Sequence, residues 1–128
     1  MSTVLLDTHV VQWWSAEPDR LSREAAGVVG AADELAVAAI TWFELAWLGR
    51  RGRIVVNIPI RSWLEQLSGQ LRTFGITAAI ADTAVSLAEG FPGDPADRLI
   101  YATATEHGLP LVTKDAKLRA RPGSVAVW

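Results

Sequence analysis

The chain has 128 residues, of which 50% are hydrophobic and 20% charged, and its net charge is −2 with an isoelectric point of about 5.6. This balance favours one folded domain, expected to span residues 1–128, over a disordered chain. The acidic character argues against a protein that coats nucleic acid non-specifically, because such proteins are usually basic. The acidic charge does not exclude an enzyme that contacts a phosphodiester through bound cations.

The sequence carries no feature of an exported or membrane protein. It has no cysteine, which fits a reducing compartment. The first residues, MSTVLLDTH, lack a basic region and a long apolar run, so no secretory signal is expected. No stretch approaches the ~20 apolar residues that a membrane-spanning helix needs. We therefore expect a cytoplasmic location and no membrane contact.

In the first half of the chain, short apolar runs alternate with helical segments. The predicted elements, in chain order, are a strand at 4–6, a helix at 8–15, a helix at 21–31, a buried strand at 35–40 and a helix at 41–51. Pro18 interrupts the first helical pattern, Ser22 is a candidate cap for the second helix, and the third helix stops near Gly52.

The second half continues the same alternation. Its predicted elements are a helix at 59–71, a strand at 73–77, a helix at 80–89, a turn at 91–95 (FPGDP), a helix at 95–107, a strand at 109–112, a helical turn from 115 and a strand at 125–128. Apolar strands that alternate with helices are typical of a parallel sheet covered on both faces. The expected fold is a three-layer α/β/α domain with a central, mainly parallel sheet.

Acidic residues follow the predicted strands at the points where the strands end. Asp7 follows the first strand, Glu44 lies in the first helical turn after the second, and Asp115 comes just after the next-to-last strand. Asp94 and Asp97 open the helix that precedes that strand. The carboxyl ends of parallel strands share one rim, where ligands bind in such sheets, so these acids can converge there.

A convergent set of carboxylates needs a compensating charge. At ~4 Å and an effective dielectric of ~20, each close pair of carboxylates costs about 4 kcal/mol, whereas a helix cap contributes only ~1 kcal/mol. Oxygen-only ligands suit Mg²⁺ or Mn²⁺. His9 and His107 show no spacing typical of metal ligands and are interpreted as ordinary surface or helix residues.

Most of these acids also have a purely structural explanation. Thr41 and Glu44 match the capping-box pattern S/T-x-x-E. Asp94 and Asp115 can cap helices, and Asp97 can be a first-turn acid that the helix dipole favours. Asp7, which follows a buried strand, is harder to explain by capping. Taken together, the acids favour a cation site.

Four segments carry a resemblance to a known family. In chain order they are LLDTH (5–9), TWFEL (41–45), DPADRLIYATA (94–104) and LVTKD (111–115). They resemble the PIN-domain nucleases and, more closely, the toxin component of VapBC toxin–antitoxin pairs. The resemblance covers essentially the whole chain, including a tryptophan at the end of a short final strand, Trp128.

The resemblance implies a metal-dependent endoribonuclease that inhibits translation and growth. By position, the family's acidic quartet, expected to be catalytic and to hold Mg²⁺ or Mn²⁺, corresponds to Asp7, Glu44, Asp97 and Asp115. Supporting residues are expected to be Asp94, Thr113, Thr41 and Arg98. A cognate VapB-type antitoxin and a homodimer are implied as well.

Phosphate contacts and the antitoxin surface are expected at two further groups of residues. The candidate phosphate-binding residues are Arg50, Arg51, Lys114 and Lys117, although solvated helix ends explain them equally well. The four tryptophans at positions 13, 14, 42 and 47 can line a groove for an antitoxin segment, although most are expected in the core.

The chain departs from the toxin subgroup at three places, and two rival functions stay open. Residues 91–93 stand where the subgroup often has a histidine, Ala96 stands where it often has phenylalanine, and Leu48 where it often has lysine. These departures concern substrate contacts more than the quartet. The rivals are a receiver-type module phosphorylated on an aspartate and a PIN-like domain that only binds protein.

Overall fold

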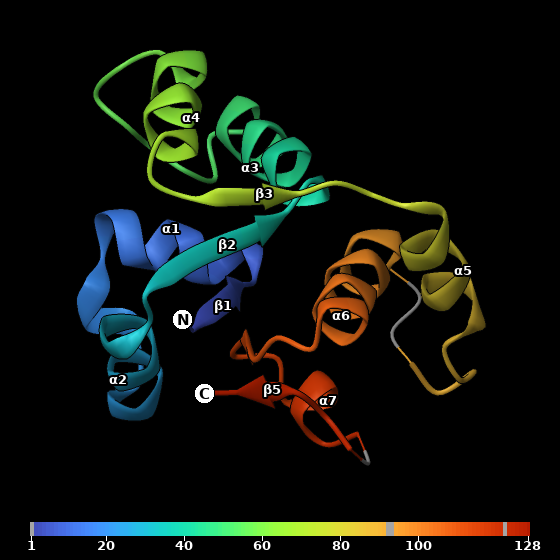
Figure 1. Ribbon diagram of the computed structural model, residues 1–128. Helices are drawn as coiled ribbons and strands as arrows, with labels where there is room; N and C mark the ends of the chain where they lie inside the picture. Colours follow the sequence, from blue (N-terminus) through green and yellow to red (C-terminus); the bar gives the residue numbers. More distant parts are fainter. Residues whose placement is uncertain (1, 92–93, 122) are drawn as a thin grey trace.

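A five-stranded parallel sheet crosses the middle of the molecule in the computed structural model, which describes residues 2–91, 94–121 and 123–128 (Figure 1). Its strands are β1 (Thr3–Leu6), β2 (Glu34–Ala38), β3 (Arg72–Phe74), β4 (Leu111–Val112) and β5 (Ala126–Val127). They lie in the order β3-β2-β1-β4-β5, and each pairing is parallel. The chain therefore builds the sheet outward in one direction from β1 and then in the other, which places a topological switch point between β1 and β4.

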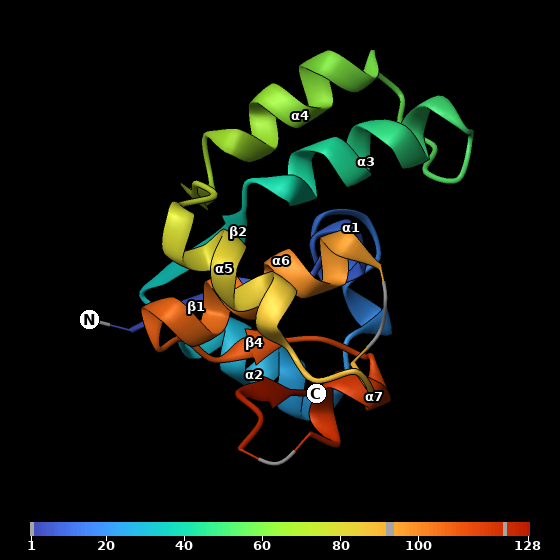
Figure 2. The same ribbon diagram turned by 90° about the vertical axis from the view of Figure 1, so that its right-hand side faces the viewer.

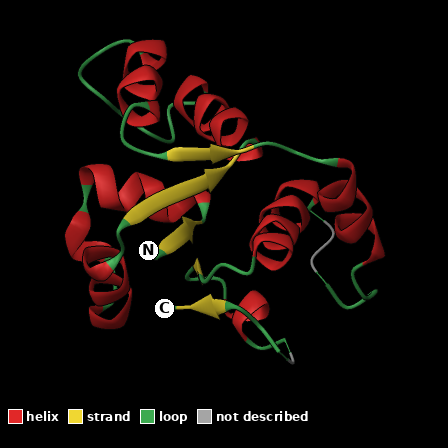
Figure 3. Cartoon of the chain, viewed as in Figure 1, coloured by secondary structure: helices red, strands yellow, loops and turns green. Residues whose placement is uncertain are grey.

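Helices cover both faces of this sheet (Figure 3). They are α1 (Thr8–Ala16), a short 3₁₀ helix (Pro18–Arg20), α2 (Arg23–Ala31), α3 (Ile40–Arg50), α4 (Ile60–Ser68), α5 (Ala78–Ser86), α6 (Pro95–His107) and α7 (Ala116–Arg119). In Figure 1, α1 and α2 lie on one side of the sheet and α6 and α7 on the other, with α5 outside α6. The predicted three-layer α/β/α fold is confirmed. Among the described residues, no helix is long and apolar enough to cross a membrane.

Alternation along the strands sends neighbouring side chains into different core clusters on the two faces of the sheet. Leu6 packs with Val10 of α1 and the apolar face of α2, whereas its neighbour Leu5 packs with Ile100 of α6 and with α7. Both leucines are fully buried, as expected for a central strand covered on both faces. The central position of β1 fixes where its last residue points, and that residue leads directly into α1.

Helices α3 and α4 pack against each other and extend beyond the edge of the sheet (Figure 2). Gly49 of α3 allows this close approach, because a Cβ at that position would come within 2.6 Å of the Ile60 side chain on α4. Helix α3 begins at Ile40, just after the carboxyl end of β2 at Ala38, so its first turn lies at that end of the sheet.

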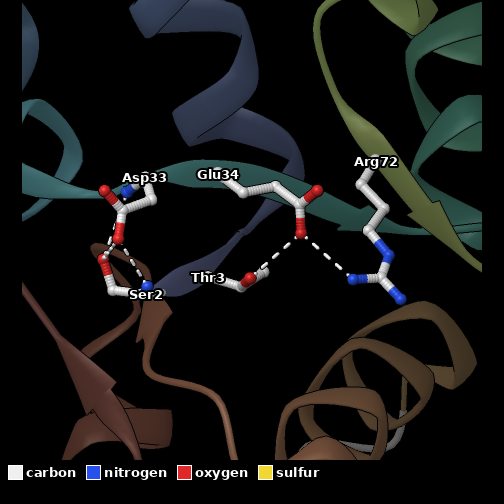
Figure 4. A network of polar contacts seen from close by, with 5 residues as sticks. All are labelled: Ser2, Thr3, Asp33, Glu34 and Arg72. Atoms are coloured by element: carbon white, nitrogen blue, oxygen red, sulfur yellow. Dashed lines mark hydrogen bonds and ion pairs between the residues drawn. The ribbon is translucent and has the colours of Figure 1, made fainter.

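A polar network closes the opposite, amino-terminal end of the sheet (Figure 4). The Glu34 carboxylate of β2 accepts a hydrogen bond from the Thr3 hydroxyl of β1 at 3.0 Å and pairs with the Arg72 guanidinium of β3 at 3.1 Å. These hydrogen bonds, with Arg72 contributing most, lower the pKa of Glu34. Asp33 accepts from the Ser2 backbone N–H at 2.7 Å. The network aligns the three strands at the end far from the acids at the carboxyl rim.

Several helix boundaries follow the predicted capping residues. Ser22 caps α2, accepting from the Ala25 N–H at 3.0 Å, and Asp94 caps α6 with Pro95 in its first turn. Gly108 ends α6 in the left-handed conformation, with φ of 64°. Residues Pro92 and Gly93 of the predicted FPGDP turn lie outside the described residues.

Other boundaries were predicted wrongly. β2 ends at Ala38 and α3 begins at Ile40, so Thr41 lies inside the helix and makes no capping box with Glu44. Thr77, assigned to a strand, caps α5 instead, because its hydroxyl accepts from the Ile80 N–H at 3.1 Å. The helix at Ile60–Ser68 and the strands at Leu111–Val112 and Ala126–Val127 are each shorter than the predicted segments 59–71, 109–112 and 125–128.

Two glycine substitutions test this backbone. Gly108→Ala should lower the free energy of unfolding by about 1–2 kcal/mol, because alanine is strained at a positive φ. Gly27→Ala, in the exposed interior of α2 where a Cβ meets no atom within 4 Å, should raise it by about 0.5–1 kcal/mol. Urea unfolding curves measure both, and equal effects of the two changes would contradict the assigned end of α6.

Candidate active site

Asp7 is held at the switch point by the strand register itself. Leu6 of β1 pairs with Val112 of β4, and the Asp7 N–H donates to the Val112 carbonyl at 3.0 Å. One carboxylate oxygen of Asp7 accepts from the Thr8 N–H at 2.7 Å, and the other accepts from the Thr113 hydroxyl at 2.7 Å. Asp7 is therefore both the cap of α1 and a carboxylate oriented by the neighbouring strand.

Glu44 reaches the same rim from α3. The Thr8 hydroxyl donates a short hydrogen bond to Glu44 Oε1, and it lies 3.3 Å from the hydroxyl of Thr41. Both threonines are buried, whereas Glu44 is half-buried. Thr41 thus acts through Thr8 on the orientation of Glu44, which is a different role from the predicted helix cap.

The remaining acids come from the starts of α6 and α7. Asp94 Oδ1 accepts from the Ala96 N–H at 2.8 Å, and Asp97 lies one turn further along, half-buried. Asp115 Oδ1 accepts from the Lys117 N–H at 2.8 Å, and its own N–H donates to the Thr113 hydroxyl at 3.1 Å. Asp94 and Asp115 therefore cap their helices and also lie at the rim with the other acids.

These acids surround one cavity of about 540 Å³, called here the acidic cavity. Its lining residues are Asp7, Thr8, His9, Trp13, Glu44, Asp94, Asp97, Lys114 and Asp115. The whole predicted quartet is thus brought together, with the accessory Asp94, from four separate elements. Lys114 is the one predicted phosphate-binding residue in this lining.

Burial and mutual repulsion change the acidity of these carboxyls. Burial, with the charges of Asp7, Asp94, Glu44 and Asp115 adding to it, raises the pKa of Asp97 to about 7. Burial also raises the pKa of Asp7 despite the opposing hydrogen bonds from Thr113 and Thr8. The pKa of Glu44 is raised by burial and by the charges of Asp7 and Asp94. At Asp7 and Glu44, burial therefore outweighs the hydrogen bonds and the His9 charge that favour the ionised carboxylates.

The chemistry of the rim fits a hard divalent cation, although its side chains are not closed around one. Within the described ranges, no three Asp, Glu, His or Cys side chains are arranged as a ready group of metal ligands. Carboxylates and hydroxyls dominate the cavity wall, and these are the ligands that Mg²⁺ and Mn²⁺ prefer. Binding one cation between three of these side chains would therefore require them to draw closer together.

A second cavity adjoins the first on the side of α3. This α3 pocket, of about 380 Å³, is lined by Thr8, His9, Ile40, Phe43, Glu44, Trp47, Leu48, Asp94, Pro95 and Ala96. It includes Ala96 and Leu48, two of the three places where the chain departs from the toxin subgroup. The α3 pocket and the acidic cavity share Thr8, His9, Glu44 and Asp94, so the two spaces are continuous.

The other predicted site residues lie around these two cavities. Arg98 extends to the end of α5, where it donates to the carbonyl of Ala84 at 3.0 Å, and its guanidinium lies 5.6 Å from the Phe91 ring centre. Arg51 lies over the Trp47 ring at 4.2 Å. Arg50 and Lys117 are exposed and belong to neither lining.

Three residues that line the acidic cavity were not predicted as part of the site. Thr8, His9 and Trp13 all belong to α1, the helix that Asp7 caps. Their signal was present in the sequence, because residues that follow a strand-end acid in a parallel sheet face the same rim. Trp13 also packs under Lys114, whose ammonium lies 5.7 Å from the ring centre.

The fold and the cavity define a class of domain: a parallel α/β/α sheet with a carboxylate site at its switch point. The family model of the PIN domain matches residues 4–123. Ribonuclease VapC22 from Mycobacterium tuberculosis is 62% identical over 130 aligned positions, which cover 100% of both chains. The chain therefore belongs to the PIN-domain family, in its VapC-type branch.

Solved structures of low sequence identity share the fold. A toxin–antitoxin complex from Klebsiella pneumoniae superposes with a TM-score of 0.70 at 20% identity, covering 98% of this chain and 96% of that one. DNA-bound VapBC from Salmonella typhimurium superposes with a TM-score of 0.72 at 21% identity, covering 99% and 98%. These likenesses agree with the observed order of helices and strands.

Replacing Thr113 tests the anchoring of Asp7. Thr113→Val keeps the shape of the side chain but removes the donor to Asp7 and the acceptor for the Asp115 N–H, so the free energy of unfolding should fall by about 2 kcal/mol. Thr113→Ser retains the hydroxyl and should lose less than half of that. Equal losses for the two variants in urea unfolding would assign the effect to packing instead.

The acidity of Asp97 makes stability depend on pH in the absence of divalent cations. Its folded-state pKa of about 7 lies above the usual 3.8, so its contribution is complete at low pH and is lost as pH rises toward 7. Asp97→Asn removes this loss. Relative to wild type, the variant should gain about 1 kcal/mol of unfolding free energy between pH 4 and pH 8, allowing for solvent screening.

Urea unfolding in EDTA across this pH range measures the gain. Asp82→Asn, an exposed change on α5, is the matched control and should show no such trend. A gain at low pH instead of high pH would contradict the raised pKa of Asp97.

Proposed function

We propose that this protein is a metal-dependent endoribonuclease that acts in the cytoplasm as the toxin of a toxin–antitoxin pair, cutting RNA and so inhibiting translation and growth. The observation that carries the proposal is the gathering of Asp7, Glu44, Asp97 and Asp115 around one cavity at the switch point. The 62% identity to a VapC ribonuclease over the full chain supports the same activity.

Asp7 and Asp97 are the proposed direct ligands of Mg²⁺ or Mn²⁺. Glu44 and Asp115 would bind directly or through water, because Mg²⁺ tends to retain part of its water shell. When bound, the cation supplies positive charge for the pentacoordinate phosphate and lowers the pKa of a water. Thr113 holds Asp7 in place, Thr41 acts on Glu44 through Thr8, and Asp94 adds charge beside Asp97. Arg98 ties α6 to the end of α5 and so helps to position Asp97.

The proposed reaction is hydrolysis by a water molecule. Its oxygen attacks phosphorus in line while the bond from phosphorus to O3′ breaks. The O3′ oxygen takes up a proton from solvent, so the products carry a 5′-phosphate and a 3′-hydroxyl. Glu44 would take the proton of the water, since it lines the acidic cavity beside the proposed ligands. Lys114, at the cavity wall, would hold a phosphate, with Arg51, Arg50 and Lys117 further out.

A VapB-type antitoxin is the proposed partner, because the solved structures of the same fold include VapBC complexes. A homodimer remains a prediction from the family resemblance. The receiver-type alternative is disfavoured by the PIN-domain match over residues 4–123. An assay of RNA cleavage distinguishes the proposed nuclease from a PIN-like domain that only binds protein.

Replacing the proposed ligands tests the function. Asp7→Ala and Asp97→Ala should each lower the rate of RNA cleavage by at least about 100-fold, because each removes a carboxylate from the cation site. Asp82→Ala, an exposed acid on α5, should cut as the wild type does. Rates are measured on purified protein with Mg²⁺ or Mn²⁺, and the fragment ends are sequenced.

Two results would remove the proposal. Wild-type cleavage rates in both Asp7→Ala and Asp97→Ala would show that the quartet is not the site. Fragments with 2′,3′-cyclic phosphates would show attack by the ribose hydroxyl instead of water. Growth arrest on expression, relieved by the same variants, would separate a nuclease toxin from a binding module.

A further inference from the structure

The α3 pocket differs in chemistry from the acidic cavity that it joins. Its inner wall is apolar, formed by Ile40, Leu48 and the two aromatic residues Phe43 and Trp47. Its volume of about 380 Å³ lies within the range of about 300–1,000 Å³ typical of small-molecule sites. Such a pocket suits a flat, largely apolar group of modest size.

Phe43 and Trp47 offer an aromatic surface to the solvent. They lie one helical turn apart on α3, with ring centres 6.2 Å apart and planes inclined by only 23°. Phe43 is 63% exposed and Trp47 is 52% exposed, which is unusual for large apolar side chains. Exposed rings that lie nearly parallel are the platform on which unpaired nucleobases stack.

The position of the pocket restricts what can enter it. Thr8, His9, Glu44 and Asp94 line both cavities, so an occupant of the α3 pocket lies directly beside the acidic cavity. A phosphate would be repelled by Glu44 and Asp94 at the shared edge. A base carries no charge, and the N–H groups on its edge can donate to carboxylates.

Positive charge lies beside the aromatic surface, where a backbone would pass. The Arg51 guanidinium rests over the Trp47 ring at 4.2 Å, and Arg50 and Arg53, which are close to it in sequence, are exposed. This arrangement matches single-stranded nucleic acid, whose bases stack on aromatic rings while its phosphates contact arginines.

We propose that the α3 pocket binds one unpaired nucleobase of the RNA, next to the phosphate that is cut, by stacking it on Phe43 and Trp47. This inference rests on the proposed ribonuclease function and adds a specificity-determining subsite to it. The base must leave any helical stack to enter, so the enzyme selects cut sites in loops or single strands.

Single-base deletions from the substrate test the subsite. Sequenced fragment ends from the wild type define an RNA oligonucleotide, and a set of variants lacks one base at each position beside the cut. For the wild type, one such abasic position should lower kcat/KM by roughly 5- to 150-fold, as expected for loss of one aromatic–base stack.

Trp47→Ala should lower kcat/KM for the intact RNA by a similar factor and should cost little more on the abasic RNA. Trp47→Phe retains a ring and should recover most of the loss. Phe43→Ala is an independent second variant, since Phe43 is also exposed. Val85→Ala, an exposed apolar change on α5 in neither lining, is the control. Urea unfolding midpoints verify that each variant is folded.

Fluorescence anisotropy of labelled RNA gives a reading that does not depend on cleavage. In the Asp97→Ala background, adding Trp47→Ala should raise the Kd for the intact RNA and leave the Kd for the abasic RNA unchanged. Agreement of both measurements supports the subsite.

Two outcomes overturn it. The pocket holds no base if Trp47→Ala and Phe43→Ala cut and bind intact RNA as the wild type does. It also holds no base if the loss from each variant is the same on every abasic RNA as on the intact RNA. If the wild type cuts no RNA, the proposed function itself fails and this subsite fails with it; cleavage that is insensitive to Trp47 overturns the subsite alone.

Discussion

The hydrogen bonds that hold Asp7 organise the rest of the site. Its backbone N–H bonds to β4, one carboxylate oxygen accepts from the start of α1, and the other accepts from Thr113. These contacts join the ends of β1 and β4, and the two bonded residues, Asp7 and Thr113, are 106 positions apart in the sequence. Because β1 is the central strand, buried on both faces, its end cannot move without disturbing both halves of the core.

The same rim concentrates negative charge, and this has a cost in the metal-free protein. Burial and neighbouring carboxylates raise the pKa of Asp97, Asp7 and Glu44 together, so the folded chain resists full ionisation of the site. A domain that kept such a cluster only for helix capping would gain less from the caps than it loses by repulsion. A divalent cation at the proposed site would resolve this conflict, so cation binding and stability should be coupled.

In the proposed function, the acidic cavity and the α3 pocket would have different roles in recognising an RNA strand. The acidic cavity supplies carboxylates where a cation and a phosphate would meet. The α3 pocket supplies an aromatic surface that disfavours a charged group. Glu44 borders both, and its neighbours along α3, Phe43 and Trp47, turn toward the apolar side. Helix α3 would thus carry both the proposed proton acceptor, Glu44, and the proposed base-binding residues, Phe43 and Trp47.

The sequence by itself determined the layer architecture, the strand-end acids and several caps. Apolar alternation indicated buried strands, and Ser22, the Asp94–Pro95 pair and Gly108 mark helix ends through local hydrogen bonds and φ preferences, which need no tertiary contact. Thr41 was predicted as a helix cap and Thr77 as part of a strand, and both predictions were wrong. Which threonine caps a helix depends on where the preceding strand stops pairing with its neighbour in the sheet. Only the tertiary structure decided that Thr8 bonds to Glu44 and that Phe43 and Trp47 stay exposed, since both facts depend on how α1 and α3 pack across the sheet edge.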